Sequence, residues 1–313
     1  MEKSVKGLLL TKKKLRSVAR HWQLYLLLIL PLTYLIVFKY IPMAGLQIAF
    51  KDFSPKLGVW GSEWVGLKYF KKFFNSYQFT KVLKNTLVIS FYSLVVGTPA
   101  PIVLALLINS AEVKWFKKAV QTITYIPHFI SIVVLVGMIN QIFNPISGVF
   151  GSIYKMFSSG EVPNILGIPK AFYHTYVWSG IWQEIGWSSI IYVAALSNVD
   201  PELHDAARVD GASRFKRMLY IDLPALIPTL VILLIMRCGS LMSVGYTKVL
   251  LMQNGFNMSY SEVISSYVYK MGLGSNGNYS FATAVSFFNS LVNFVLISIV
   301  NNISKKVGEE SLW

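Results

Sequence analysis

Long apolar stretches without charged residues alternate with short charged segments along this chain. Four stretches contain no Asp, Glu, Lys or Arg: residues 21–38, 85–111, 119–154 and 271–304. Two further apolar stretches contain one charge each, Glu184 in 171–199 and Arg237 in 223–247. Because roughly 20 apolar residues suffice for a helix to cross a bilayer, the pattern predicts an all-α polytopic membrane protein. Its six transmembrane helices are expected at about residues 22–41, 85–108, 119–143, 172–197, 224–247 and 280–302.

The segments between these helices complete the predicted organisation. The expected parts are a cytoplasmic basic leader at 1–21, a first transmembrane helix at 22–41, an extracytoplasmic loop at 42–81, a core of five transmembrane helices at 82–303 that includes a cytoplasmic loop at 198–223, and a cytoplasmic tail at 304–313. With the N-terminus inside, sixteen of the 29 Lys and Arg residues fall in the short inner segments. The positive-inside rule therefore predicts a multi-pass cell-membrane protein with both termini cytoplasmic.

Several of the predicted transmembrane helices contain proline, among them Pro31, Pro99, Pro101 and Pro127. Each proline lacks the N–H donor of a helical hydrogen bond. In a membrane such positions are tolerated where neighbouring groups satisfy the freed carbonyl oxygen. We interpret all four as kinks rather than as parts of a gate.

Composition agrees with a membrane protein and excludes several other classes. Of the 313 residues, 54% are hydrophobic and 14% are charged, against about 25% charged residues in soluble proteins. The net charge of +15 could suggest nucleic-acid binding, but the basic residues flank the apolar stretches, so we expect no nucleic-acid partner. The one cysteine, Cys238, allows no internal disulfide, and the scattered histidines show no metal-ligand spacing.

The loop at 198–223 has clear helix-start and reversal signals. Asp200 is a good N-cap residue, and Pro201 suits the first position of a helix. Gly211 permits a sharp reversal of the chain. A second short basic helix is expected from Ala212 to about Tyr220. The loop is therefore predicted to form a bent helical element at the cytoplasmic surface, where another protein could dock.

The same loop resembles a known motif. Asp205-Ala206-Ala207, followed at the family spacing by Gly211 and by Ile221-x-Leu223-Pro224, looks like the EAA motif of permease subunits of ATP-binding-cassette (ABC) importers. In that family the loop docks into a groove of the ATP-binding subunit. Asp205 stands where the family usually has Glu. The resemblance implies that the coupling residues are Asp205, Ala206, Ala207, Arg208, Asp210, Gly211, Ile221, Leu223 and Pro224.

Further segments are similar to the carbohydrate-uptake branch, and within it to lipopolysaccharide-, alginate- and rhamnogalacturonan-oligosaccharide-type permeases. They include Lys84-Asn85-Thr86-Leu87, Gly186-Trp187, Ile190-Ile191-Tyr192 and Glu310-Ser311-Leu312-Trp313.

The resemblance implies a type I ABC importer permease fold in a prokaryotic cell membrane. It also implies an alternating-access mechanism that imports a carbohydrate, with motion transmitted through residues 201–217. The implied partners are a second homologous permease, two ATP-binding subunits and an extracytoplasmic substrate-binding protein. The chain has no G-x-x-x-x-G-K-[ST] phosphate loop. We therefore expect a transport subunit that is not an enzyme and binds no cofactor, with ATP and Mg held by the partner subunits.

The two charges inside apolar stretches are candidates for the substrate path. Ionisable residues at membrane depth are costly and usually face a bundle interior or a wet cavity. Glu184 and Arg237 are predicted either to form an ion pair that fixes helix packing or to line the path. Gln183 and Trp187 share a helix face and join them as path candidates. An alternative is an autonomous ion-coupled secondary transporter or channel that uses Glu184 and Arg237, although no internal repeat supports it.

The predicted outer loop at about 42–84 is rich in Phe, Lys and Tyr, as its segment 67–79 (LKYFKKFFNSYQF) shows. Two interpretations stay open for it: a docking surface for the substrate-binding protein, or an amphipathic segment at the outer leaflet.

Overall fold

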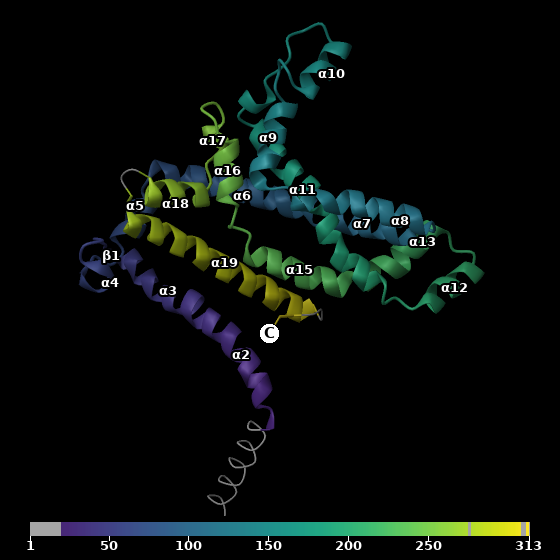
Figure 1. The fold of residues 1–313 in the computed structure, drawn as a ribbon, viewed down its shortest axis with the longest axis horizontal. Coiled ribbons are helices and arrows are strands. Elements are labelled where there is room, and N and C mark those ends of the chain that lie inside the picture. Colours follow the sequence, from purple (N-terminus) through teal and green to yellow (C-terminus); the bar gives the residue numbers. More distant parts are fainter. Residues whose placement is uncertain (1–19, 275–276, 308–310, 313) are drawn as a thin grey trace, which may run out of the picture. The chain divides into compact units, whose positions relative to one another are not determined.

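The structure, a computed structural model, describes residues 20–274, 277–307 and 311–312. These residues are mostly helical (Figure 1), and the chain divides after Leu67 into two units. Most of the predicted leader at 1–21 and part of the predicted tail at 304–313 lie outside the described residues.

The first unit contains a helical stretch that is longer than the predicted first span. It runs without interruption as α2 (Trp22–Leu35), η1 (Ile36–Tyr40), α3 (Ile41–Met43) and η2 (Ala44–Phe50). A small antiparallel hairpin follows, made of β1 (Lys51–Asp52) and β2 (Glu63–Trp64), with α4 (Gly58–Gly61) between its strands. Lys51 closes this hairpin, because its ammonium group donates to the carbonyl of Val59 at 2.8 Å.

The second unit begins with the helices of the predicted second, third and fourth spans and of the segments that precede and connect them. They are α5 (Lys68–Phe74), α6 (Tyr77–Gly97), α7 (Pro99–Ser110), α8 (Lys114–Tyr125), η3 (Ile126–Phe129), α9 (Ile132–Ile142), α10 (Val149–Phe157), η4 (Ile165–Gly167) and α11 (Ala171–Leu196). The long helix α11 packs along both α6 and α7 (Figure 1).

The remaining helices contain the predicted coupling loop and the last two spans. They are α12 (Pro201–Val209), α13 (Arg214–Arg217), η5 (Met218–Asp222), α14 (Leu223–Ala225), α15 (Ile227–Gly239), α16 (Tyr246–Met252), α17 (Met258–Ser261), α18 (Ile264–Leu273) and α19 (Tyr279–Val307). Helix α19 packs against α15 and α18 (Figure 1). The predicted second short helix is longer than expected, since helical structure continues from Arg214 to Ala225.

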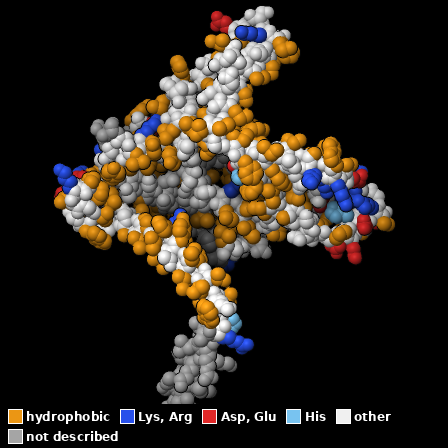
Figure 2. Space-filling model, in the orientation of Figure 1, with side chains coloured by type: hydrophobic (Ala, Val, Ile, Leu, Met, Phe, Trp, Pro, Cys, Tyr) orange, Lys and Arg blue, Asp and Glu red, His pale blue; other side chains and the backbone are white. Residues whose placement is uncertain are grey.

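Helices occupy all six places where the sequence predicts a span. By length and composition, three described helical stretches could cross a membrane: Trp22–Phe50, Tyr77–Ser110 and Tyr279–Lys306. The count reaches five if two bent pairs are each one span. Helix α11 has 26 residues and lies at the remaining place, but it is not among them. Figure 2 shows hydrophobic side chains over most of the visible helix surfaces, with charged ones gathered around α12 and α13.

The predicted third span is not one continuous helix. Its two parts, Lys114–Phe129 and Ile132–Ile142, meet at an angle of 102°. Pro127 lies in the 3-10 turn before the break, and Ile130 and Ser131 are extended. Ser131 then caps α9, because its hydroxyl accepts the N–H of Val134 at 3.3 Å. The kink expected at Pro127 is therefore a full change of direction.

Aromatic residues of segment 67–79 pack inside the second unit. Tyr69 and Phe73 are 4% and 1% exposed. The ring of Phe73 lies edge-on to those of Phe79, Phe281 and Phe288, at centroid distances of 5.0–6.2 Å. Much of the aromatic character of this segment is thus core packing against α19, which neither of the two sequence-based interpretations anticipated.

Helices α8 and α11 approach so closely at Gly186 that no side chain fits there. A Cβ atom at this position would collide with the backbone carbonyl of Thr124. We expect Gly186→Leu to destabilise the protein by about 1–3 kcal/mol or more and to lower its melting temperature. Gly137→Leu is the matched control, because a Cβ at Gly137 in α9 meets no atom within 4 Å. Equal melting temperatures for the two variants would contradict this account of the packing.

Candidate functional site

The predicted coupling loop begins as its sequence indicates. Helix α12 has Pro201 at its first position, and the carboxylate of its N-cap residue Asp200 accepts the N–H of Glu202 at 2.9 Å. This bond satisfies one of the N–H groups that a helix start leaves without a partner. The cap and the proline together fix where the helix starts, so the loop leaves the end of α11 in a defined direction.

The end of α12 depends on Gly211. This residue has φ +75°, a left-handed conformation that glycine adopts without strain. The N–H of Gly211 donates to the carbonyl of Arg208 at 3.0 Å, and that of Ala212 donates to Ala207 at 2.8 Å. This pair of bonds is the Schellman arrangement of a helix C-terminus. The sharp reversal predicted at Gly211 is confirmed.

Most of the predicted coupling residues present an accessible surface. Asp205, Ala206, Arg208 and Asp210 are exposed, and Ala207 is half-buried. Arg208 forms an exposed ion pair with Asp205 within the helix at 3.2 Å. No residue of α12 is buried, so the described residues leave room for another chain to contact it.

The second half of the motif leads into the predicted fifth span. Ile221 lies in η5, Leu223 packs beside the apolar cluster around Leu226, and Pro224 lies in α14. The helix bends by 56° before α15 continues. At this entrance the buried carboxylate of Asp222 contacts His204 of α12 at 3.3 Å.

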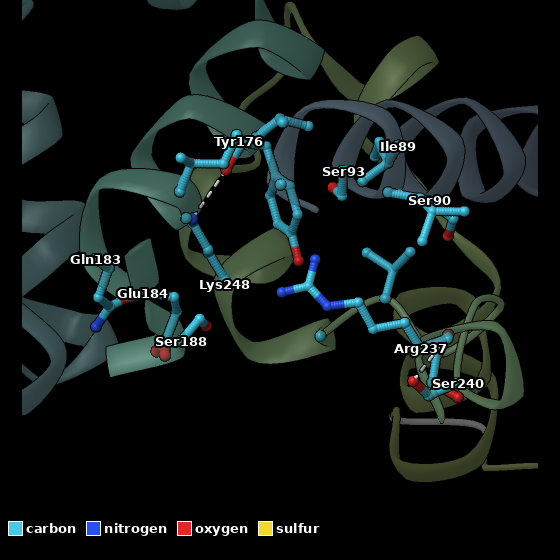
Figure 3. A pocket seen from close by; sticks show the side chains of 18 of the residues that line it. Ile89, Ser90, Ser93, Tyr176, Gln183, Glu184, Ser188, Arg237, Ser240 and Lys248 are labelled. Atoms are coloured by element: carbon cyan, nitrogen blue, oxygen red, sulfur yellow. Dashed lines mark hydrogen bonds between the residues drawn. The ribbon is translucent and has the colours of Figure 1, made fainter. Parts of the chain in front are cut away.

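A cavity of about 380 Å³ lies between α6, α11, α15 and α16 (Figure 3). Five serines line it among apolar residues, together with three charged side chains. These are Glu184 of α11, Arg237 of α15 and Lys248 of α16. The structure therefore brings Glu184 and Arg237 to one cavity, as one of the two sequence hypotheses expects. Gln183 also lines it, whereas Trp187 does not.

Glu184 and Arg237 have separate partners and do not form the hypothesised ion pair. The carboxylate of Glu184 contacts Nδ1 of His128 at 2.9 Å. The guanidinium of Arg237 donates to the hydroxyl of Thr98 at 3.1 Å. Since His128 lies in the break of the third span, Glu184 ties α11 to that break.

Gln183 and Trp187 hold the same break. The amide of Gln183 donates to the carbonyl of Ile130 at 2.8 Å, a group freed by the extended backbone there. The ring of Trp187 stacks on His128 at a centroid distance of 4.3 Å with the planes 2° apart. Three of the four predicted path residues thus position the bend of the third span, and two of them also face the cavity.

Lys248 is the cavity residue that the sequence analysis missed. It is 7% exposed, its ammonium group donates to the carbonyl of Tyr176 at 2.9 Å, and it lies 4.7 Å from the centre of that ring. The sequence held one signal for it: Lys248 directly follows the charge-free second half of the fifth predicted span. Within the described part of the chain, neither Lys248 nor Arg237 has an acidic group within ion-pair distance.

Comparisons with known proteins agree with this architecture. Residues 97–309 match the family described as binding-protein-dependent transport system inner membrane component. Protein LplB of Bacillus subtilis (strain 168) is 43% identical over 297 residues, covering 95% of this chain and 93% of that protein. The polygalacturonan/rhamnogalacturonan transport system permease protein YteP of the same organism is 41% identical over 302 residues, covering 96% and 94%.

Solved structures show the same fold. A chain in the crystal structure of a bacterial ABC transporter involved in the import of the acidic polysaccharide alginate is 37% identical, with a TM-score of 0.85 over 94% of this chain and 99% of that one. A second structure of a bacterial alginate transporter, in complex with an alginate pentasaccharide-bound periplasmic protein, gives a TM-score of 0.86 at 36% identity, covering 95% and 99%. The chain therefore belongs to the family of binding-protein-dependent transport system inner membrane components and has the type I ABC importer permease fold of its sugar and oligosaccharide permeases.

Proposed function

We propose that this chain is one of two permease subunits of an ATP-driven importer for an acidic oligosaccharide. Its partners would be a second homologous permease, two ATP-binding subunits that hold ATP and Mg, and an extracytoplasmic substrate-binding protein. ATP binding closes the two ATPase subunits, and residues 201–217 transmit that motion to the membrane helices. Both termini and the coupling loop face the cytoplasm in this arrangement.

The charge of the cavity supports the choice of an acidic substrate. Arg237 and Lys248 place two cations along its wall, whereas the single carboxylate, Glu184, is engaged with His128. A carboxylate of a sugar acid can take up the donors of Arg237 and Lys248 that protein groups leave available, and such charge-assisted bonds are stronger than neutral ones. The serine hydroxyls of the same wall can exchange hydrogen bonds with sugar hydroxyls. The similar alginate transporters act on an acidic polysaccharide.

Transport by the reconstituted complex tests this function. The chain is co-purified with its partner subunits in vesicles that contain ATP, and uptake of an alginate pentasaccharide is compared with that of a neutral pentasaccharide. We expect uptake that requires ATP and the substrate-binding protein and that favours the acidic sugar. Uptake by this chain alone, driven by a proton gradient, would instead establish the autonomous transporter. Equal uptake of the two sugars would overturn the acidic substrate class.

A further inference from the structure

Three side chains from three elements meet around one buried carboxylate oxygen. Oδ1 of Asp222, in η5, accepts a hydrogen bond from the amide of Asn109 in α7 at 3.2 Å. The same oxygen lies 3.3 Å from Nε2 of His204 in α12. Asp222 is 3% exposed, so its carboxylate is shielded from water. Hydrogen bonds to a charged group are stronger in such a buried environment than in water.

Among the described residues, His204 is the one side chain of α12 that makes a polar contact with another element. Arg208 bonds Asp205 within the helix. Apolar packing does not replace this contact. A hollow of about 420 Å³ separates Leu203 of α12 from the end of α11 and from Tyr220 and Ala225. Apart from the backbone at its two ends, α12 is thus held to the membrane helices mainly by the contact of His204 with Asp222.

The membrane side of this contact reaches two separate helices. Asp222 directly precedes Leu223-Pro224, where the chain turns into α15. Asn109 lies in the last turn of α7, and its backbone carbonyl accepts a hydrogen bond from the ammonium group of Lys117 of α8 at 3.1 Å. A displacement of α12 that moves His204 therefore acts on the start of α15 and, through Asn109, on the ends of α7 and α8.

From this geometry we infer that His204, Asp222 and Asn109 form a polar linkage that transmits movement of the coupling loop to α7 and α15. The inference rests on the proposed ATP-driven function. These three are positioning residues, because they touch neither substrate nor nucleotide. Removing one of them would let the coupling loop move without carrying the membrane helices, so that more ATP is hydrolysed for each sugar imported.

The test compares His204→Ala and Asn109→Ala in the full complex, with ATP hydrolysed per sugar imported as the readout. We expect this ratio to rise about tenfold for His204→Ala, which removes the polar contact with the Asp222 carboxylate, and less for Asn109→Ala. The sugar concentration for half-maximal uptake should stay at the wild-type value. His204→Gln, which keeps a donor, should restore most of the coupling. Asn198→Ala is the matched control, because among the described residues its side-chain amide bonds the carbonyl of Ala194, four residues earlier in the chain, at 3.4 Å and reaches no other helix.

The outcomes separate the linkage from the function on which it rests. A wild-type complex without ATP-driven uptake would refute the proposed function itself. A wild-type complex that transports, with His204→Ala at the wild-type ratio, would overturn the linkage alone. If the complex with His204→Ala fails to assemble, Asn109→Ala and His204→Gln test the linkage in its place. In that case, a ratio of ATP to sugar for Asn109→Ala equal to that for Asn198→Ala overturns the linkage.

Discussion

Replacing Gly211 by valine should uncouple ATP hydrolysis from uptake while the chain still inserts into the membrane. The residue has φ +75°, and a Cβ there would meet no atom within 4 Å, so the effect comes from backbone strain and not from a clash. An L-residue in the left-handed region costs about 1–2 kcal/mol, and a β-branched one suffers most. Relief of this strain breaks the two hydrogen bonds that end α12 and changes its direction. We expect uptake to fall roughly tenfold in vesicles, with ATPase activity retained.

Two variants distinguish coupling from general instability. Gly211→Asn should retain most of the uptake, because Asn tolerates the left-handed conformation. Gly66→Val imposes comparable strain in the first unit, since Gly66 has φ +59° and also has open space around it, yet it should leave the ratio of ATP to sugar unchanged. Normal uptake by Gly211→Val would remove the main support for the coupling loop.

The coupling loop could be predicted from the sequence because its signals are local. The cap of Asp200, the first-turn position of Pro201 and the reversal at Gly211 each depend on residues within one or two turns. Such interactions form whatever the rest of the chain does. The six helix positions were predictable for a similar reason, since charge-free length is a property of one segment at a time.

The partners of the buried polar groups could not be predicted in the same way. Glu184 was expected to meet Arg237 on the ground of similar depth, but it meets His128, which is 56 residues away in the sequence. That contact exists because α8 and η3 pack against α11, which places His128 beside Glu184. The break itself depends on tertiary support from Gln183. The depth of a residue along its helix therefore does not show which neighbouring helix supplies its partner.

Lys248 illustrates a second reason. Counted along the sequence, it is a basic residue at the outer end of a span and would be assigned to the membrane surface. In the structure, α16 turns back toward α11, so that the side chain is buried against Tyr176 and faces the cavity. The structure, and not the sequence, therefore shows that the positive charge of Lys248 belongs to the cavity.

Removing the cavity cations should weaken transport of an acidic oligosaccharide far more than that of a neutral one. Hydrogen bonds to charged groups contribute about 1.5–3 kcal/mol, so losing one should lower uptake of an alginate pentasaccharide roughly tenfold to a hundredfold. We expect this loss for Arg237→Met and for Lys248→Met, measured as initial uptake rates at low sugar concentration. Arg237→Lys keeps the charge and should retain part of the activity.

The controls separate charge recognition from packing. Lys155→Met removes one positive charge from the exposed surface of α10 and should leave uptake of the acidic sugar unchanged. If Arg237 and Lys248 only supported helix packing, their replacement would lower uptake of the acidic and the neutral pentasaccharide equally and would reduce recovery of the assembled complex. A loss confined to the acidic sugar, in complexes that assemble normally, requires that the two cations act on the carboxylates of the substrate, since the neutral sugar follows the same path through the same helices.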